Sequence, residues 1–156
     1  MKRNNKLGFL IVGLLLIAGG TLFQLGFFPF SQFHSSSISL AVRGKDYKYE
    51  KEKADGYISE TWTSEKDKIV IGMATFHTKS EADIYWDKTV SSSSSSEIKK
   101  TDLIFTRTAS ADGNLFGTQI YMFVAQRGKK IMVVVGMGTT KDEFGFTLLK
   151  LGFLYY

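Results

Sequence analysis

The chain has 156 residues, of which 44% are hydrophobic and 22% are charged, a balance that is ordinary for a folded protein. It contains no cysteine, which excludes disulfides, thiolate metal sites, cysteine nucleophiles and lipid attachment to an N-terminal cysteine. The net charge of +5 comes mostly from Lys2, Arg3 and Lys6, so it excludes the strong, clustered basic surface expected of a nucleic-acid-binding protein.

An uncharged apolar run, residues 7–30, follows this basic tail directly. As an α-helix rising 1.5 Å per residue it would reach roughly 36 Å, enough to cross a hydrocarbon core about 30 Å thick. Two interpretations stay open, a retained anchor and a signal peptide cleaved after the small residues 18–20. The length of the run and the residues that flank it favour a retained anchor, because cleavage would leave an exposed N-terminus rich in Leu and Phe before Pro29.

The cations Lys2, Arg3 and Lys6 set the expected orientation, because basic residues next to a span stay on the cytoplasmic side. The remainder is therefore expected outside, in the periplasm or at the cell surface. The sequence predicts a cytoplasmic basic tail (1–6), a transmembrane signal-anchor helix (7–30), a polar tether (31–37) and an extracytoplasmic α+β domain (38–156).

The first half of that domain alternates apolar and polar residues, as strands do. Two strands, 46–53 and 57–63, are predicted to meet at the tight turn Asp55-Gly56, and residues 68–77 form a third. Thr78 and Glu81 fit a capping box for a helix over 79–91. A serine run, residues 91–96, then reads as a flexible connection.

The second half predicts strands over 101–109, 115–126 and 129–138 and a C-terminal helix capped by Thr140 and Glu143. Asp112-Gly113 marks a turn before the second of these strands. The resulting fold class is α+β, an antiparallel sheet of about six strands with two helices on one face.

The stretch "IMVVVGMGTTKDEFGFTLLKLGF" resembles the C-terminal part of the PsbP/Mog1/DcrB-like fold, in which an apolar last strand leads into a helix ending near an aromatic residue. The similarity covers residues 57–153 in element order and 115–153 in residue pattern. The chain departs from the family in its ending "KLGFLYY" and in its serine run. The resemblance implies an accessory or assembly-type binding domain without established catalysis, and it transfers no functional residue.

No catalytic, cofactor-binding or metal-binding pattern emerges from the residues. His77 stands without a partner motif, and the glycines form neither G-x-G-x-x-G nor a P-loop. Asp83 is predicted to lie in solvent, away from the apolar helix stripe that contains Trp86. Glu60 is predicted to belong to an exposed, charge-laced hairpin. We therefore expect a non-enzyme with no cofactor.

The strand 115–126 offers the strongest candidate surface. Tyr121 and Phe123 share one face of it, and an uncovered face bearing them and Phe116 would make an apolar interaction patch. Cover by the 46–63 hairpin or the terminal tyrosines is the competing interpretation. The expected partners are the lipid bilayer, through residues 7–30, and a membrane protein; nucleic acid is not expected. The alternative function is a secreted or anchored module that binds a small apolar ligand.

Overall fold

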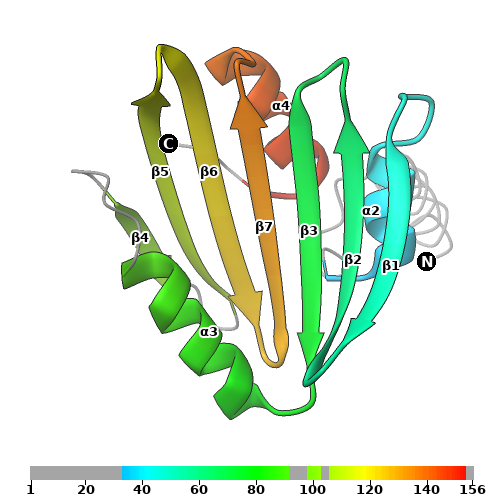
Figure 1. The fold of residues 1–156 in the computed structure, drawn as a ribbon, viewed down its shortest axis with the longest axis vertical. Helices are drawn as coiled ribbons and strands as arrows, with labels where there is room; N and C mark the ends of the chain where they lie inside the picture. The colour runs from blue at the N-terminus through cyan, green and yellow to red at the C-terminus, as the bar shows by residue number, and fades with distance from the viewer. Residues whose placement is uncertain (1–32, 92–97, 103–105, 154–156) are drawn as a thin grey trace, which may run out of the picture.

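The computed structural model describes residues 33–91, 98–102 and 106–153, which form one sheet of seven antiparallel strands (Figure 1). The strands lie in the order β1-β2-β3-β7-β6-β5-β4, so the α+β class is confirmed with one strand more than predicted. The strands are β1 (Lys48–Ala54), β2 (Tyr57–Ser64), β3 (Ile69–Phe76), β4 (Lys99–Asp102), β5 (Arg107–Leu115), β6 (Thr118–Arg127) and β7 (Lys130–Met137). The helices are α2 (Ser35–Ala41), α3 (Lys79–Ser91) and α4 (Lys141–Lys150).

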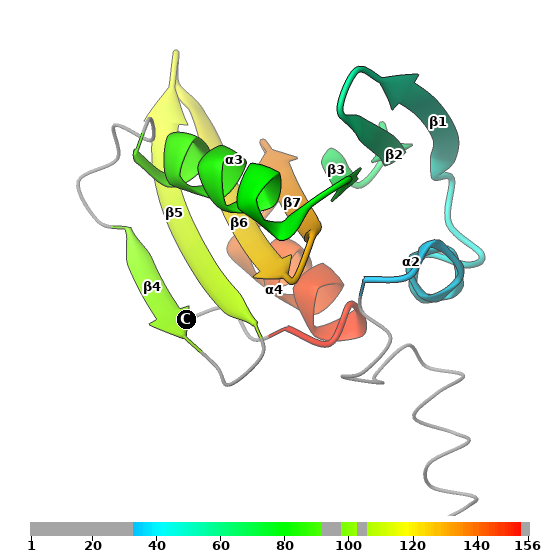
Figure 2. The ribbon, with the colours of Figure 1, turned by 90° about the horizontal axis from the view of Figure 1, so that it is seen from below.

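The helices cover both faces of the sheet, which corrects the prediction that α3 and α4 share one face. In Figure 2, α3 lies on one side of the strands, while α2 and α4 lie on the other. The reason is the composition of the central strands. In β7, Met132 and Val134 point to one face while Ile131 and Val133 point to the other, so both faces need apolar cover.

The larger core lies between the sheet and the pair α2 and α4. Phe144 and Leu148 of α4 are fully buried there against Tyr121 and other side chains of the central strands. The Tyr121 and Phe144 rings stack with their centroids 5.5 Å apart. The smaller core, on the opposite face, contains Trp86 and packs α3 against the end of the sheet where the β6–β7 turn lies.

Both predicted capping boxes are present. The Thr140 hydroxyl accepts a hydrogen bond from the Glu143 backbone N–H, and the Glu143 carboxylate accepts one from the Thr140 backbone N–H. Thr78 and Glu81 make the same reciprocal pair at the start of α3. Because these bonds satisfy orphan donors of the first helical turn, they fix where each helix begins.

The region before β6 differs from the prediction. Asp112 and Gly113 do not form a turn; they lie within β5, opposite Tyr121 and Ile120. The chain reverses instead at Phe116-Gly117. Of the strand predicted over 101–109, residues 101–102 belong to β4 and 107–109 to β5, while 103–105 lie outside the described residues. The Asp-Gly signal was outweighed because β5 pairs with the long β6 along its whole length.

The N-terminal boundary of the domain also differs. Within the predicted tether, Phe33 is buried and Ser35–Ser37 belong to the first turns of α2, so the folded domain begins by residue 33. The predicted anchor at 7–30 lies outside the described residues. Among the helices that are described, none has the length and apolar character needed to cross a membrane.

The glycines of the β7–α4 unit generate the first prediction. A Cβ at Gly136 would lie 2.6 Å from Thr139 Cγ2 and 2.8 Å from Phe144 Cδ2. Since Phe144 is wholly buried and cannot move aside, Gly136→Ala should lower the free energy of unfolding by about 1–3 kcal/mol. Gly145→Ala is the matched control, because its Cβ meets open space in α4 and should raise stability by about 0.5–1 kcal/mol. Urea denaturation of both variants measures this, and equal effects would contradict the packing described.

Candidate functional site

The predicted interaction residues separate in the structure. Tyr121 and Phe123 are buried beneath α4 and the segment that follows it, where the Phe123 and Phe153 rings lie 4.9 Å apart. Phe116, in contrast, is 98% exposed at the tip of the β5–β6 hairpin. The face that bears Tyr121 and Phe123 is therefore covered, by α4 and Phe153 rather than by the 46–63 hairpin, while the terminal tyrosines lie outside the described residues.

The opposite face of the same strands is the one that the described residues leave partly uncovered. α3 lies over only half of that face, near the β6–β7 turn, and the rest presents apolar side chains to solvent. We call this surface the apolar shelf. It is formed by Val70, Ile120, Met122, Val135 and Met137, with Leu115 and Phe116 at its outer end.

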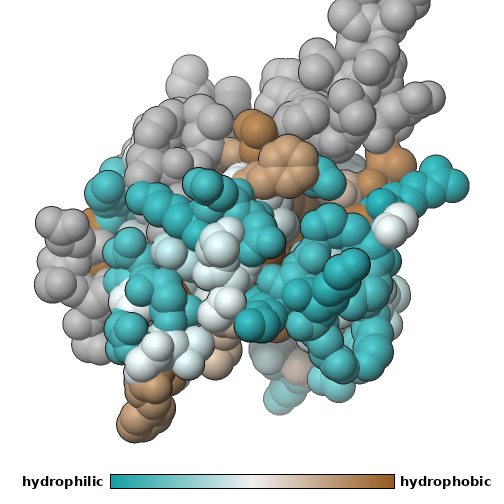
Figure 3. All heavy atoms as spheres, turned by 90° about the horizontal axis from the view of Figure 1, so that it is seen from above, coloured by the Kyte–Doolittle hydropathy of each residue, from teal (hydrophilic) through white to brown (hydrophobic). Residues whose placement is uncertain are grey.

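Strand register makes the shelf continuous. Val70 of β3 lies opposite Val135 of β7, which lies opposite Met122 of β6. The next row pairs Met137, 51% exposed, with Ile120. Figure 3 views the molecule from this end and shows a hydrophobic group projecting from a largely hydrophilic surface. Contiguous apolar surface of this kind is typical of interaction sites.

The backbone at the end of the shelf is strained. Phe116 has φ of 50°, and Gly117 follows with φ of 82°, so both central residues of the turn have the positive φ of a type I′ hairpin. Asn or Gly suits the first of these positions, whereas a large aromatic residue costs on the order of 1–2 kcal/mol there. Phe116 buries no surface that would offset this cost, which points to a use outside the isolated domain.

A polar cluster holds α3 against the sheet. Because α3 borders the apolar shelf, the cluster also holds the edge of the shelf in place. Asp83 is not solvated as predicted, because its Oδ1 accepts hydrogen bonds from Arg107 Nη2 at 2.7 Å and from Gln126 Nε2 at 2.8 Å. Arg107 also lies over the Trp86 ring, 4.7 Å from its centroid. Bonds from Lys79 and Gln126 and the charge of Arg107 outweigh desolvation and lower the pKa of Asp83. The cluster therefore ties α3 to β5 and β6.

A second cluster ties α2 to the sheet through a buried carboxylate. Glu60 is only 5% exposed, which corrects its predicted place on an exposed hairpin. Ser35 of α2 donates to it at 2.7 Å, Tyr49 of β1 donates at 2.7 Å, and Lys51 lies 3.5 Å away. Burial opposes the charged form, but these bonds and the Lys51 charge together lower the pKa of Glu60. Glu60 lies two residues before the buried Trp62 and therefore on the same side of β2. This alternation was the signal in the sequence that Glu60 is buried.

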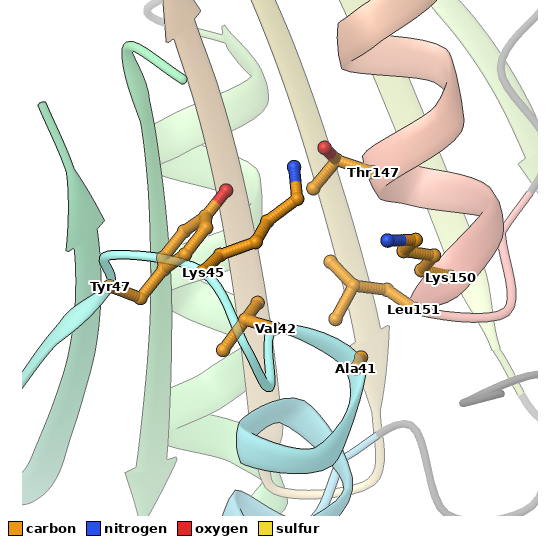
Figure 4. A pocket seen from close by; sticks show the side chains of 7 residues that line it. All are labelled: Ala41, Val42, Lys45, Tyr47, Thr147, Lys150 and Leu151. Atoms are coloured by element: carbon orange, nitrogen blue, oxygen red, sulfur yellow. The ribbon is translucent and has the colours of Figure 1, made fainter. Parts of the chain in front are cut away.

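A small hollow lies between the end of α2, the segment after it and α4 (Figure 4). Lys45 and Tyr47 reach into it from one side and Thr147 from α4 on the other. Burial, followed by the nearby charge of Asp67, raises the pKa of the Tyr47 hydroxyl well above its ordinary value. The hollow has room for about one water molecule, which is far below the volume of about 300–1,000 Å³ typical of small-molecule sites.

The titratable residues considered from the sequence do not converge. His77 lies exposed after β3, and Asp83 is engaged by Arg107 and Gln126. Across the described ranges, no three His, Cys, Asp or Glu side chains group as metal ligands would. The apolar shelf is therefore the best-developed candidate site in the described part of the chain.

Comparisons with known proteins assign no family to this chain. The sequence matches no protein-family model, and no curated protein matches it. A search of solved structures found a GTP binding regulator from Thermotoga maritima, with a TM-score of 0.45 and 16% sequence identity. The alignment covers 76% of this chain and 83% of that chain. This likeness is too low to assign a function.

The Glu60 cluster generates the second prediction. Because the folded-state pKa of Glu60 is lowered, its ionised form stabilises the fold above the carboxyl's ordinary pKa of about 4.3, and this stability is lost as pH falls through the lower folded pKa. Glu60→Gln should therefore lower the free energy of unfolding most at pH 6–7 and progressively less toward pH 3. Urea denaturation at several pH values measures the difference.

Exposed Glu50→Gln on β1 is the matched control and should leave the pH dependence nearly unchanged. A Glu60→Gln deficit of the same size at every pH would contradict the role given to the Glu60 charge.

Proposed function

We propose that this chain is a single-pass membrane protein whose extracytoplasmic α+β domain binds another protein through the apolar shelf, as an accessory or assembly subunit of a membrane complex. Residues 7–30 would span the bilayer, with Lys2, Arg3 and Lys6 on the cytoplasmic side. The observation that carries the interaction role is the uncovered half of the sheet face, continued by an exposed, strained Phe116.

The shape of the shelf favours a helix as the element that binds there. α3 stands on the same face and forms a step one helix thick, roughly 10 Å above the strands. A second flat sheet would strike α3 before reaching Met122 and Val135. An amphipathic helix laid beside α3 would complete a helical layer like the one that α2 and α4 form on the other face.

Two further points support an accessory role over the alternative of a small apolar-ligand module. The hollow beside α4 is smaller than a typical ligand site and is lined by Lys45, Lys150 and a tyrosine hydroxyl as well as apolar groups. The resemblance to the PsbP/Mog1/DcrB-like fold also implies an accessory domain. The ligand-binding alternative therefore has no specific observation in its favour.

Site-specific photo-crosslinking in native membranes tests this proposal. A benzophenone amino acid in place of Phe116 should give a discrete crosslinked product containing a second membrane protein, because the tip borders the occupied shelf. The same probe in place of Phe146, an exposed phenylalanine on the outer side of α4, is the matched control and should give none.

Adding Met137→Gln should reduce the product from position 116 several-fold, since Met137 is a central, half-exposed side chain of the shelf. Equal products from positions 116 and 146, or a product indifferent to Met137→Gln, would contradict binding at the shelf.

A further inference from the structure

The β6–β7 turn carries three cations in four residues, Arg127, Lys129 and Lys130 around Gly128. Arg127 and Lys129 have no ion-pair partner among the residues that the structure describes, and Lys129 is exposed. Lys130 Nζ donates a hydrogen bond of 2.6 Å to the backbone carbonyl of Phe33. The basic turn is thus attached to the first described residue of the domain.

This attachment fixes how far the basic turn can lie from the proposed membrane span. Three peptide steps separate Phe33 from Phe30, the last residue of the apolar run, and they reach at most about 11 Å. The headgroup layer of one leaflet is roughly 5–8 Å thick, and charges act through about 8–10 Å at physiological salt. The Lys130 ammonium and its neighbours therefore lie within reach of the headgroups.

No described carboxylate forms an ion pair with the basic turn. Asp83 is engaged by Lys79 and Arg107, and Glu81 caps α3. Asp55, at the β1–β2 turn, and Glu52, within β1, lie toward the same end of the sheet, and neither forms an ion pair with the basic turn.

We infer that the Arg127–Lys130 turn binds the anionic phospholipid headgroups of the membrane that holds the anchor. This inference rests on the proposed function, and it adds a fixed orientation to it. The other end of β6 leads to Phe116, roughly 30 Å away along ten residues of strand. Headgroup binding at one end of the sheet would hold the strands upright and present the apolar shelf sideways, toward a neighbour in the same membrane.

The test uses the full chain in vesicles, with a fluorophore on a single introduced cysteine, since the chain has none of its own. His77→Cys places the label beside the basic turn, whose Lys129 carbonyl accepts a hydrogen bond from Phe76 N–H. Asn114→Cys places it at the opposite end, near Phe116. A lipid spin-labelled at its headgroup quenches only a nearby fluorophore.

Quenching at position 77 should be stronger in vesicles with about one-third phosphatidylglycerol than in pure phosphatidylcholine, and it should weaken at high salt. Position 114 should show neither effect.

The double variant Arg127→Gln with Lys129→Gln should reduce the ratio of membrane-docked to undocked domains by on the order of tenfold or more. Lys66→Gln with Lys68→Gln, at the far end, is the matched control and should leave it unchanged. Inorganic phosphate should not compete with the vesicles for the basic turn, because a single free ion carries far less charge than an anionic lipid surface.

Three results would overturn the inference: quenching independent of phosphatidylglycerol, quenching retained without Arg127 and Lys129, or competition by inorganic phosphate, which would indicate a free-anion site. The unfolding midpoint of the double variant confirms that it is folded. If the full chain does not co-float with either kind of vesicle, the proposed membrane anchorage fails as well. If the chain co-floats but its quenching does not depend on phosphatidylglycerol, the result supports the membrane anchor and contradicts the headgroup contact.

Discussion

The burial of Phe33 against Phe153, with the Phe33 carbonyl bonded to Lys130, is the contact on which the rest of the account depends. It starts the folded domain three residues after the uncharged run ends. A flexible tether would let the domain turn freely above a membrane. If the apolar run crosses a membrane as proposed, the two residues between it and Phe33 would link the orientation of the membrane helix to that of the sheet, and each end of the sheet would have a distinct role.

The second constraint is that the central strands are apolar on both sides. Helices α2 and α4 pack against the central strands on one side, whereas α3 covers only part of the other side. The shelf therefore lies next to a helix that Asp83, Arg107 and Gln126 hold in place. A preformed, rigid border lowers the entropy that a partner must lose on binding. The strain at Phe116 fits the proposed interaction, because it costs stability at a ring that no described residue covers.

Local signals in the sequence were enough to predict most elements but not how they pack. Both capping boxes, the Asp55-Gly56 turn and the buried Trp86 were correct because each depends on residues close in the chain. The face of β6 that α4 covers could not be predicted, because both faces alternate apolar residues equally well. The engagement of Asp83 depends on Arg107 and Gln126, which are 24 and 43 positions away, and no local pattern reveals it. The burial of Glu60 depends on Ser35, 25 positions away, and its alternation with Trp62 was the only local sign of it.

The claim that most needs direct measurement is that residues 7–30 remain attached and hold the folded domain at a membrane. Carbonate-washed membranes, followed by intact mass determination, measure both points in one preparation. The account predicts that the protein stays in the washed membrane pellet with a mass that includes the segment 1–30. A carbonate-released product that starts near Thr21 would contradict it, since the cations of the tail and most of the apolar run would then be absent from the mature chain.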